Sequence, residues 1–268
     1  MASCLLAFIE AADVSGGHLV AWSDSWCGQN KNFYVLCLWQ HLIRNGRFSI
    51  IDHKFPESGH SYMDSDRDFA FIEKGVRRVE NVYSVDQYQD IMAQSQVKSK
   101  PQITRMKGNL YDIKMLPAAL GLAQCNKTTD GEKVRFRDNV RWIRIMSFGS
   151  YMFRESFNDD ETWKTVCLMQ QKSSCAATVV SIPECCHKID GDVKSAKLQD
   201  LKKQLQYIPK VYQPFYLELL AAGNKDENDN DATSGDTAKN RFVKLARFCI
   251  VMNYFCYLHT CNWLVDVL

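Results

Sequence analysis

A strand–helix–strand succession near the start of the chain limits its fold more than any other feature. Residues 18–23 (HLVAWS) and 48–55 (FSIIDHKF) are short, mostly apolar runs typical of buried strands. Between them, residues 30–44 place apolar side chains at helical spacing, and Asn45-Gly46 ends that helix. Two strands joined by a helix of this length predict a parallel pair with a right-handed crossover, and therefore an α/β fold.

The rest of the chain divides by pattern and charge. Helices are predicted over residues 1–12, 64–82, 85–95 and 194–205, strands over 140–145, 150–154, 162–170 and 177–182, and a last apolar segment over 212–220. Between residues 98 and 154 there are 12 Lys plus Arg against 4 Asp plus Glu, a local excess of +8. We expect a first domain over residues 1–97 and a basic, strand-containing unit over 98–220. Residues 221–240 predict a disordered acidic linker, and residues 241–268 an apolar, Cys-rich tail.

Composition excludes several classes of protein. The 268 residues are 46% hydrophobic and 24% charged, which argues against a wholly disordered, collagen-like or coiled-coil chain. A net charge of +2 means that any nucleic-acid-binding surface must be local. No apolar run reaches the roughly 20 residues of a spanning helix, so there is no firm membrane signal. Eleven irregularly spaced Cys and a start without a basic segment favour free thiols and an intracellular protein, nuclear or cytoplasmic.

Polar residues gather where the two predicted strands end. Asp24 follows the first strand, and His60, Asp64 and Asp66 follow the second. Ligands of open α/β sheets bind at the carboxyl ends of parallel strands, so we expect Asp24 to lie near Asp66. Converging carboxylates repel each other and are relieved by a hard divalent cation. This predicts Asp24 and Asp66 as ligands of Mg²⁺ or Mn²⁺, with no small-molecule substrate implied.

Each of these residues also has a structural interpretation. Asp24 can be a turn residue or helix cap, Asp64 an N-cap, and His60 a hydrogen-bond partner within the fold. His53 alternates with apolar strand residues and is typical of a core histidine. Adjacent Cys185-Cys186, with Cys175 and His187, lacks the spacing of structural zinc sites, so zinc is disfavoured.

The polar stretches carry a resemblance to a known family. Residues 23–32 (SDSWCGQNKN), 53–55 (HKF) and 59–69 (GHSYMDSDRDF) resemble an uncharacterised transposon-derived family that is similar to DDE-type transposases of the RNase H-like fold. Residues 197–209, followed by Phe215-Tyr216, resemble the end of the same domain, so the resemblance covers about residues 3–220.

The resemblance implies a catalytic role for four residues. Asp24 would be the middle acid and Asp66 the third, with Glu73 as its competitor and His60 beside them. Glu73 can equally be a solvent-facing helix residue. Only 23 residues precede Asp24, too few for the three strands that open such a fold and carry its first acid. We therefore expect an incomplete RNase H-like parallel half-sheet, the C-terminal half of the domain, that has lost Mg²⁺-dependent DNA cleavage or strand transfer.

A second hypothesis is a binding protein without catalysis. The basic stretch carries Trp142, Tyr151 and Phe153 among its charges, and basic plus aromatic residues fit nucleic-acid binding. A solvated strand face, or a surface for a protein partner, explains the same stretch, and the amides near residue 30 can simply start the helix. The predicted DNA contacts are Gln29, Asn30, Lys31, Asn32, Lys100, Arg105, Lys107, Arg135, Arg137 and Arg141.

Overall fold

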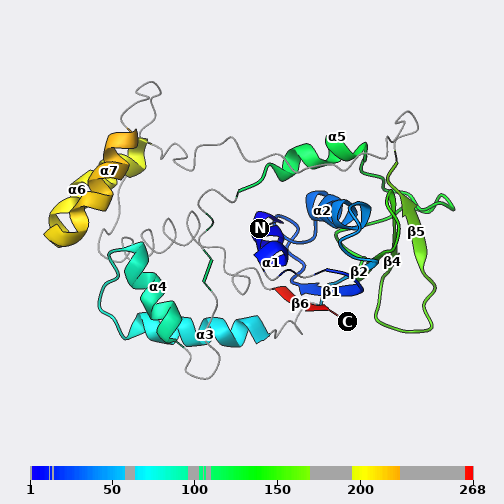
Figure 1. Ribbon diagram of the computed structural model, residues 1–268, viewed down its shortest axis with the longest axis horizontal. Helices are drawn as coiled ribbons and strands as arrows, with labels where there is room; N and C mark the ends of the chain where they lie inside the picture. The colour runs from blue at the N-terminus through cyan, green and yellow to red at the C-terminus, as the bar shows by residue number, and fades with distance from the viewer. Residues whose placement is uncertain are drawn as a thin grey trace. The chain divides into compact units, whose positions relative to one another are not determined.

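The chain folds into two compact units, each assembled from separated segments (Figure 1). This computed structural model describes residues 2–11, 13, 15–57, 64–95, 103–104, 106, 110–169, 195–223 and 263–267. The first, which we call the sheet unit, comprises Met1–Phe69, Asn109–Cys185 and Cys256–Leu268. The second, the helical unit, comprises Ala70–Gly108 and Cys186–Phe255.

A mixed sheet in the order β5-β4-β3-β2-β1-β6 forms the centre of the sheet unit. β1 and β2 run parallel, with Leu19 opposite Ile51, and every other neighbouring pair is antiparallel. The predicted α/β class and the predicted parallel pair are therefore confirmed. The strands are β1 (His18–Ser23), β2 (Ile50–Lys54), β3 (Trp142–Ile145), β4 (Ser150–Arg154), β5 (Lys164–Cys167) and β6 (Trp263–Val267).

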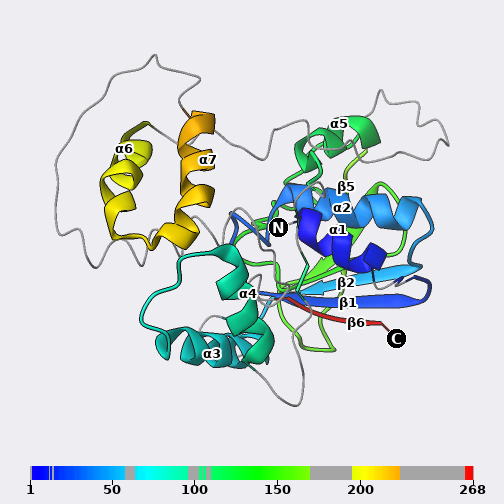
Figure 2. The ribbon, with the colours of Figure 1, turned by 60° about the vertical axis from the view of Figure 1, so that its left-hand side comes forward.

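Helices α1 (Ala2–Ala11) and α2 (Phe33–Arg44) lie together on one face of this sheet (Figure 2). α2 is the crossover between the parallel strands. The short helices η1 (Ile113–Met115) and α5 (Leu116–Leu120) pack against it. Between helices and sheet lies a closed apolar core that includes Trp39, Leu19, Ile51, Ile143 and Phe153.

Tyrosines join distant segments of the helical unit. The ring of Tyr83 stacks on Tyr212 at 5.6 Å, and the Tyr216 hydroxyl donates to the Tyr83 carbonyl at 2.6 Å. Ser84 and Gln87 form a capping box at the start of α4. α3 (Asp64–Arg77) runs from the sheet unit into this unit, which also contains α4 (Val85–Gln94), α6 (Ser195–Gln204), η2 (Leu205–Tyr207), η3 (Lys210–Tyr212) and α7 (Gln213–Gly223).

The division of the chain differs from the one the sequence predicts. β3, β4 and β5 do not form a separate unit after residue 97, because Ile143 and Ile145 place β3 beside β2, where their side chains join the same core. The sheet is consequently wider than a parallel half-sheet. The tail is not separate either, since β6 pairs with β1. The predicted strand 177–182 and residues 224–240 of the predicted linker lie outside the described residues.

Two smaller expectations differ from the structure. Cys4 is disulfide-bonded, in contrast to the expected free thiols, whereas Cys27, Cys37, Cys125 and Cys167 are free. α3 ends at Arg77, five residues before the predicted end at residue 82, and Val79, which lies within the predicted range, is exposed. Across the described ranges, we find no helix long and apolar enough to cross a bilayer.

Candidate functional site

Asp24 closes a turn between β1 and α2. Its Oδ1 accepts hydrogen bonds from the Trp26 backbone N–H at 3.1 Å and from the Asn30 amide at 2.6 Å. Asn30 is itself buried. A divalent cation at this oxygen would have to displace both donors.

The other polar residues of this turn start the helix. Asn32 is the N-cap of α2: its Oδ1 accepts from the Val35 N–H at 3.1 Å, and its amide donates to the Gln29 carbonyl at 3.0 Å. Gln29 is half-buried. The structure thus gives Asn32 the helix-starting role that was the structural alternative, whereas the Asn30 side chain bonds the Asp24 carboxylate and Gln29 contributes its backbone carbonyl.

Lys31, predicted to contact DNA, is buried at 1% exposure. Its Nζ donates to the Arg137 carbonyl at 2.7 Å and lies 5.1 Å from the centre of the Phe55 ring. Burial, reinforced by the positive charge of Arg141, lowers the pKa of Lys31 to about 8. This side chain holds the turn before β3 and is withdrawn from any phosphate.

His53 lies in the core next to this turn. Trp39 Nε1–H donates to its Nδ1 at 3.2 Å, so the proton of the neutral ring sits on Nε2 and points to Ser23 Oγ at 2.8 Å. Burial and the charge of Lys31 hold the pKa of His53 well below its usual value, which keeps the ring neutral. His53 is a core histidine.

The remaining predicted acids are not assembled into a described metal site. Asp66 is exposed on α3, and Glu73, two turns later, is half-exposed and pairs with Arg77 at 3.7 Å. His60 lies outside the described residues. In the part of the chain that the structure describes, no three His, Cys, Asp or Glu side chains group to hold a metal ion.

The predicted basic residues are spread out. Arg135 and Arg137 are exposed in the turn before β3, and Arg141 is half-buried near Lys31. Lys100, Arg105 and Lys107 lie outside the described residues.

A different set of basic and aromatic side chains does converge, on the sheet face opposite α1 and α2. Because side chains alternate along a strand, those flanking the core residues of β1 to β4 point to this face. We call it the tryptophan–cation face, and define it by Trp22, Lys54, Trp142, Arg144, Arg154 and Trp163.

Cations lie over aromatic rings throughout this face. Lys54 Nζ is 4.1 Å from the Trp142 ring centre and 5.2 Å from that of Trp22. The guanidinium carbons of Arg144 and Arg154 are 4.8 and 4.5 Å from the Trp163 ring centre. These distances are within the roughly 6 Å range of cation–π attraction.

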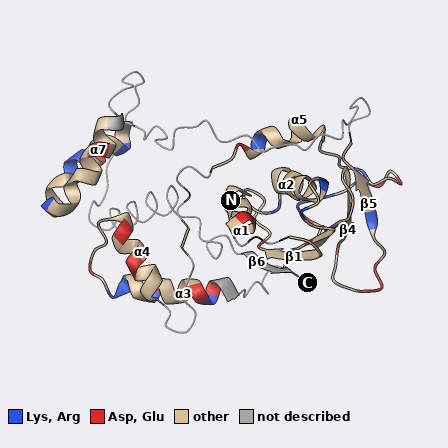
Figure 3. Cartoon of the chain, viewed as in Figure 1, with Lys and Arg blue, Asp and Glu red and all other residues tan. Residues whose placement is uncertain are grey.

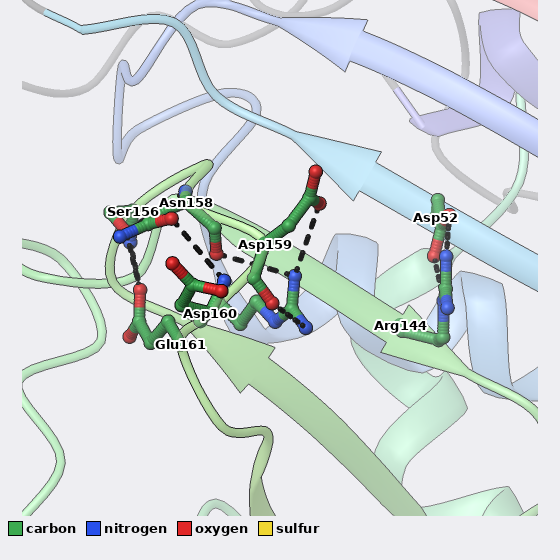
Figure 4. A network of polar contacts seen from close by, with 8 residues as sticks. Asp52, Arg144, Ser156, Asn158, Asp159, Asp160 and Glu161 are labelled. Carbon is green, nitrogen blue, oxygen red and sulfur yellow. Dashed lines mark hydrogen bonds and ion pairs between the residues drawn. The ribbon is translucent and has the colours of Figure 1, made fainter.

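One carboxylate neutralises part of the charge. Asp52, 1% exposed, accepts hydrogen bonds from both Nε and Nη2 of Arg144 at 2.7 Å (Figure 4). The Nε2 atom of His18 lies 2.9 Å from the Asp52 Oδ2. Burial alone would raise the pKa of Asp52, but the bonds and charge of Arg144 hold it below its usual value. Arg144 is therefore committed to Asp52, which leaves Lys54 and Arg154 as the cations for an external anion.

The loop between β4 and β5 lies against the same face. Its Phe157 ring is 5.5 Å from the Trp22 ring and 6.3 Å from that of Trp142. This loop is acidic, with Glu155, Asp159, Asp160 and Glu161. Figure 3 shows red segments in the loop that connects β4 and β5.

Comparison with known protein families matches residues 2–149 to a domain of unknown function, DUF7869. The chain belongs to the DUF7869 family. No curated protein and no solved structure matches it. The matched segment of this DUF7869 chain contains four of the six residues that define the tryptophan–cation face, namely Trp22, Lys54, Trp142 and Arg144.

Sequence reasoning missed most of this face in the DUF7869 chain. Of the aromatics counted in the basic stretch, Trp142 is on it, whereas Tyr151 and Phe153 are buried in the core. The available signal was alternation, which is clearest in β3, where Trp142 and Arg144 alternate with the core residues Ile143 and Ile145. Trp22 and Lys54 likewise lie in the phase of their strands opposite to the core residues Leu19 and Ile51.

Proposed function

We propose that this DUF7869 chain binds DNA through the tryptophan–cation face. The observation that supports the proposal is the stacking of Lys54, Arg144 and Arg154 on Trp22, Trp142 and Trp163 on one side of a sheet. Aromatic rings stack on bases and the cations attract phosphates, which is the combination that nucleic-acid-binding surfaces use.

The charge balance of the strands favours an anionic partner. β1 to β5 contain four Lys or Arg, namely Lys54, Arg144, Arg154 and Lys164, and a single acid, Asp52. Because both Asp52 oxygens are bonded to Arg144 or His18, its charge is screened from a ligand.

Fluorescence anisotropy of a labelled DNA oligonucleotide, titrated with the full chain between 50 and 200 mM NaCl, tests the proposal. With about two phosphates neutralised, the slope of log affinity against log salt should be roughly −1 to −2. Lys54→Ala should weaken binding and reduce the slope by about 0.7–0.9, the contribution of one phosphate.

Arg137→Ala is the matched control, since it removes one exposed cation that does not lie on this face. An unchanged affinity and slope in Lys54→Ala would contradict the proposal. Loss confined to Arg135→Ala and Arg137→Ala would move the interface to the turn before β3.

We also propose descent from a DDE-type, RNase H-like transposase, with the ancestral Mg²⁺-dependent nuclease activity lost. Support comes from the position of Asp24 at the carboxyl end of β1, beside the parallel β2 from which the chain continues to Asp66 on α3. The loss of activity is supported by Asp24, whose Oδ1 already accepts two hydrogen bonds, so that a cation at this oxygen would compete with both donors. We expect no nicking of supercoiled plasmid with MgCl₂ or MnCl₂. Nicking that Asp24→Asn and Asp66→Asn abolish would show retained catalysis.

A further inference from the structure

The β4–β5 loop places an aromatic ring and an anion on the tryptophan–cation face. Phe157 contacts Trp22 and Trp142, as described above. Two residues later, Asp159 meets Arg154: its carbonyl accepts from Nη2 at 3.3 Å, and its carboxylate Oδ1 lies 3.8 Å from Nη1 (Figure 4). The Asn158 carbonyl accepts from the same Nη1 at 3.4 Å.

The loop is a built turn that presents these two groups together. Glu161 accepts from the Glu155 and Ser156 N–H groups at 2.8 and 2.9 Å and from the Ser156 hydroxyl at 2.5 Å. Asn158 Oδ1 accepts from the Asp160 N–H at 3.2 Å. These bonds hold the ends of the turn closed without involving Phe157 or the Asp159 carboxylate.

As an occupant of the face, the loop fits poorly. The Asp159 side chain is 99% exposed, and its ion pair with Arg154 is long. Arg154 Nε is buried and finds no hydrogen-bond acceptor among the described residues. A buried donor without an acceptor is energetically unfavourable. An anion that replaced the loop and accepted from Arg154 Nε would remove this cost and bind more favourably than the loop does.

We infer that this loop is an intramolecular mimic of one nucleotide, which single-stranded DNA displaces when it binds the face. Phe157 marks the position of a base beside Trp22 and Trp142, and Asp159 marks its phosphate at Arg154. The ligand is single-stranded because the bases of a duplex are paired and stacked on each other, leaving no ring free to stack on tryptophan. This inference rests on the proposed function, and it adds that the β4–β5 loop competes with DNA for the face.

The choice of DNA follows from the acceptors on the face. Discrimination in favour of RNA uses the 2′-hydroxyl, which both donates and accepts hydrogen bonds, and a free carboxylate on the face would be the natural acceptor for its O–H group. Asp52, the only acid within β1 to β5, already has both oxygens bonded. The face offers cations and rings, which suffice for DNA.

The test compares loop variants of the full chain for binding of fluorescein-labelled oligothymidylate of 12 nucleotides in 50 mM NaCl. Phe157→Ala combined with Asp159→Asn removes both mimicking groups and should tighten binding about fivefold. Asp159→Asn alone, at a fully exposed side chain, should tighten it about twofold without affecting folding. Asp160→Asn removes the same charge from the same loop and should change affinity by less than the Asp159 variant.

The outcomes separate the two proposals. No binding of oligothymidylate or duplex by any variant would overturn the proposed function itself. Binding by the wild-type chain that the Phe157 and Asp159 variants leave unchanged would overturn the mimic alone. Equal affinity for a 12-base-pair duplex would overturn single-strand preference, and tighter binding of oligouridylate would reassign the ligand to RNA.

Discussion

Two buried charged residues differ in the partners that the fold gives them. Asp52 meets the guanidinium of Arg144, which holds the pKa of the carboxyl below its usual value despite burial. Lys31 meets a neutral carbonyl and an aromatic ring, and burial lowers its pKa to about 8. The first remains charged near neutral pH, whereas the second loses its charge in mildly alkaline solution.

Lys31 predicts a pH dependence of stability. Its native pKa is about 8, below the 10.5 of an ordinary lysine, so between these values the unfolded chain binds more protons than the native one. Stability should therefore rise with pH across this window, by on the order of 3 kcal/mol relative to Lys31→Met. Urea unfolding of both proteins at pH 7 and pH 10 measures it. A stability difference that stays flat with pH would contradict the assignment.

Residue chemistry near Asp24 could be predicted from sequence only in part. The Asn-rich turn was recognised as polar and special, but the partner of Lys31 is 106 positions away in the chain. The residues around Lys31 in the sequence give no indication that its ammonium group bonds the Arg137 carbonyl. Asn side chains serve both as helix caps and as phosphate contacts. The sequence alone therefore does not distinguish these two roles for Asn32, and the positions of its neighbours in the fold are needed to do so.

Helices and strands whose bounds are set by the nearby sequence were predicted well. β1 and β4 have the predicted bounds, and α2, α4 and α6 begin or end within three residues of theirs. The parallel pairing of β1 with β2 was predicted, but the pairing of β2 with β3 was not, because it joins residues as far apart in the chain as Ile51 and Ile145. α5 was missed, since five residues carry too little periodicity to be seen.

The start of α2 gives a test at the scale of the element. Asn32→Ala should destabilise the chain by about 1 kcal/mol, because the Val35 N–H loses its cap. Asn32→Asp keeps an acceptor at the cap and should restore most of that loss. Thermal unfolding measures both. If Asn32 contacted phosphate, the added negative charge of Asn32→Asp would weaken DNA binding, whereas a pure cap leaves affinity unchanged.

At the scale of the whole molecule, the chain visits the helical unit twice. Tyr83 and Tyr216, 133 positions apart, are joined there by one hydrogen bond. This contact could not be predicted from the sequence, because two tyrosines so far apart in the chain are brought together only by the tertiary fold. The domain boundaries predicted near residues 97 and 220 were placed where the amino-acid composition changes. The two units of the structure are instead defined by which residues contact each other.

The two units predict two patterns of amide hydrogen exchange. Tyr216→Phe removes the bond to the Tyr83 carbonyl and should speed exchange in α4, α6 and α7 about fivefold, a loss of roughly 1 kcal/mol. Exchange in β2 and β3 should stay unchanged. Tyr207→Phe, at a residue 73% exposed, is the control and should alter neither pattern. Equal acceleration in both units would mean that they open as one.

The pairing of β2 with β3 also sets the order of events during synthesis. Asp52 and Arg144, neighbours across the sheet, are 92 positions apart. At roughly 5–20 residues per second, the ribosome takes on the order of 5–20 s to deliver the second after the first. Throughout that interval β2 exposes an unpaired edge, the kind of surface on which nascent chains aggregate. We therefore expect correct folding of the sheet unit to depend on keeping the edge of β2 from aggregating until β3 has been synthesised.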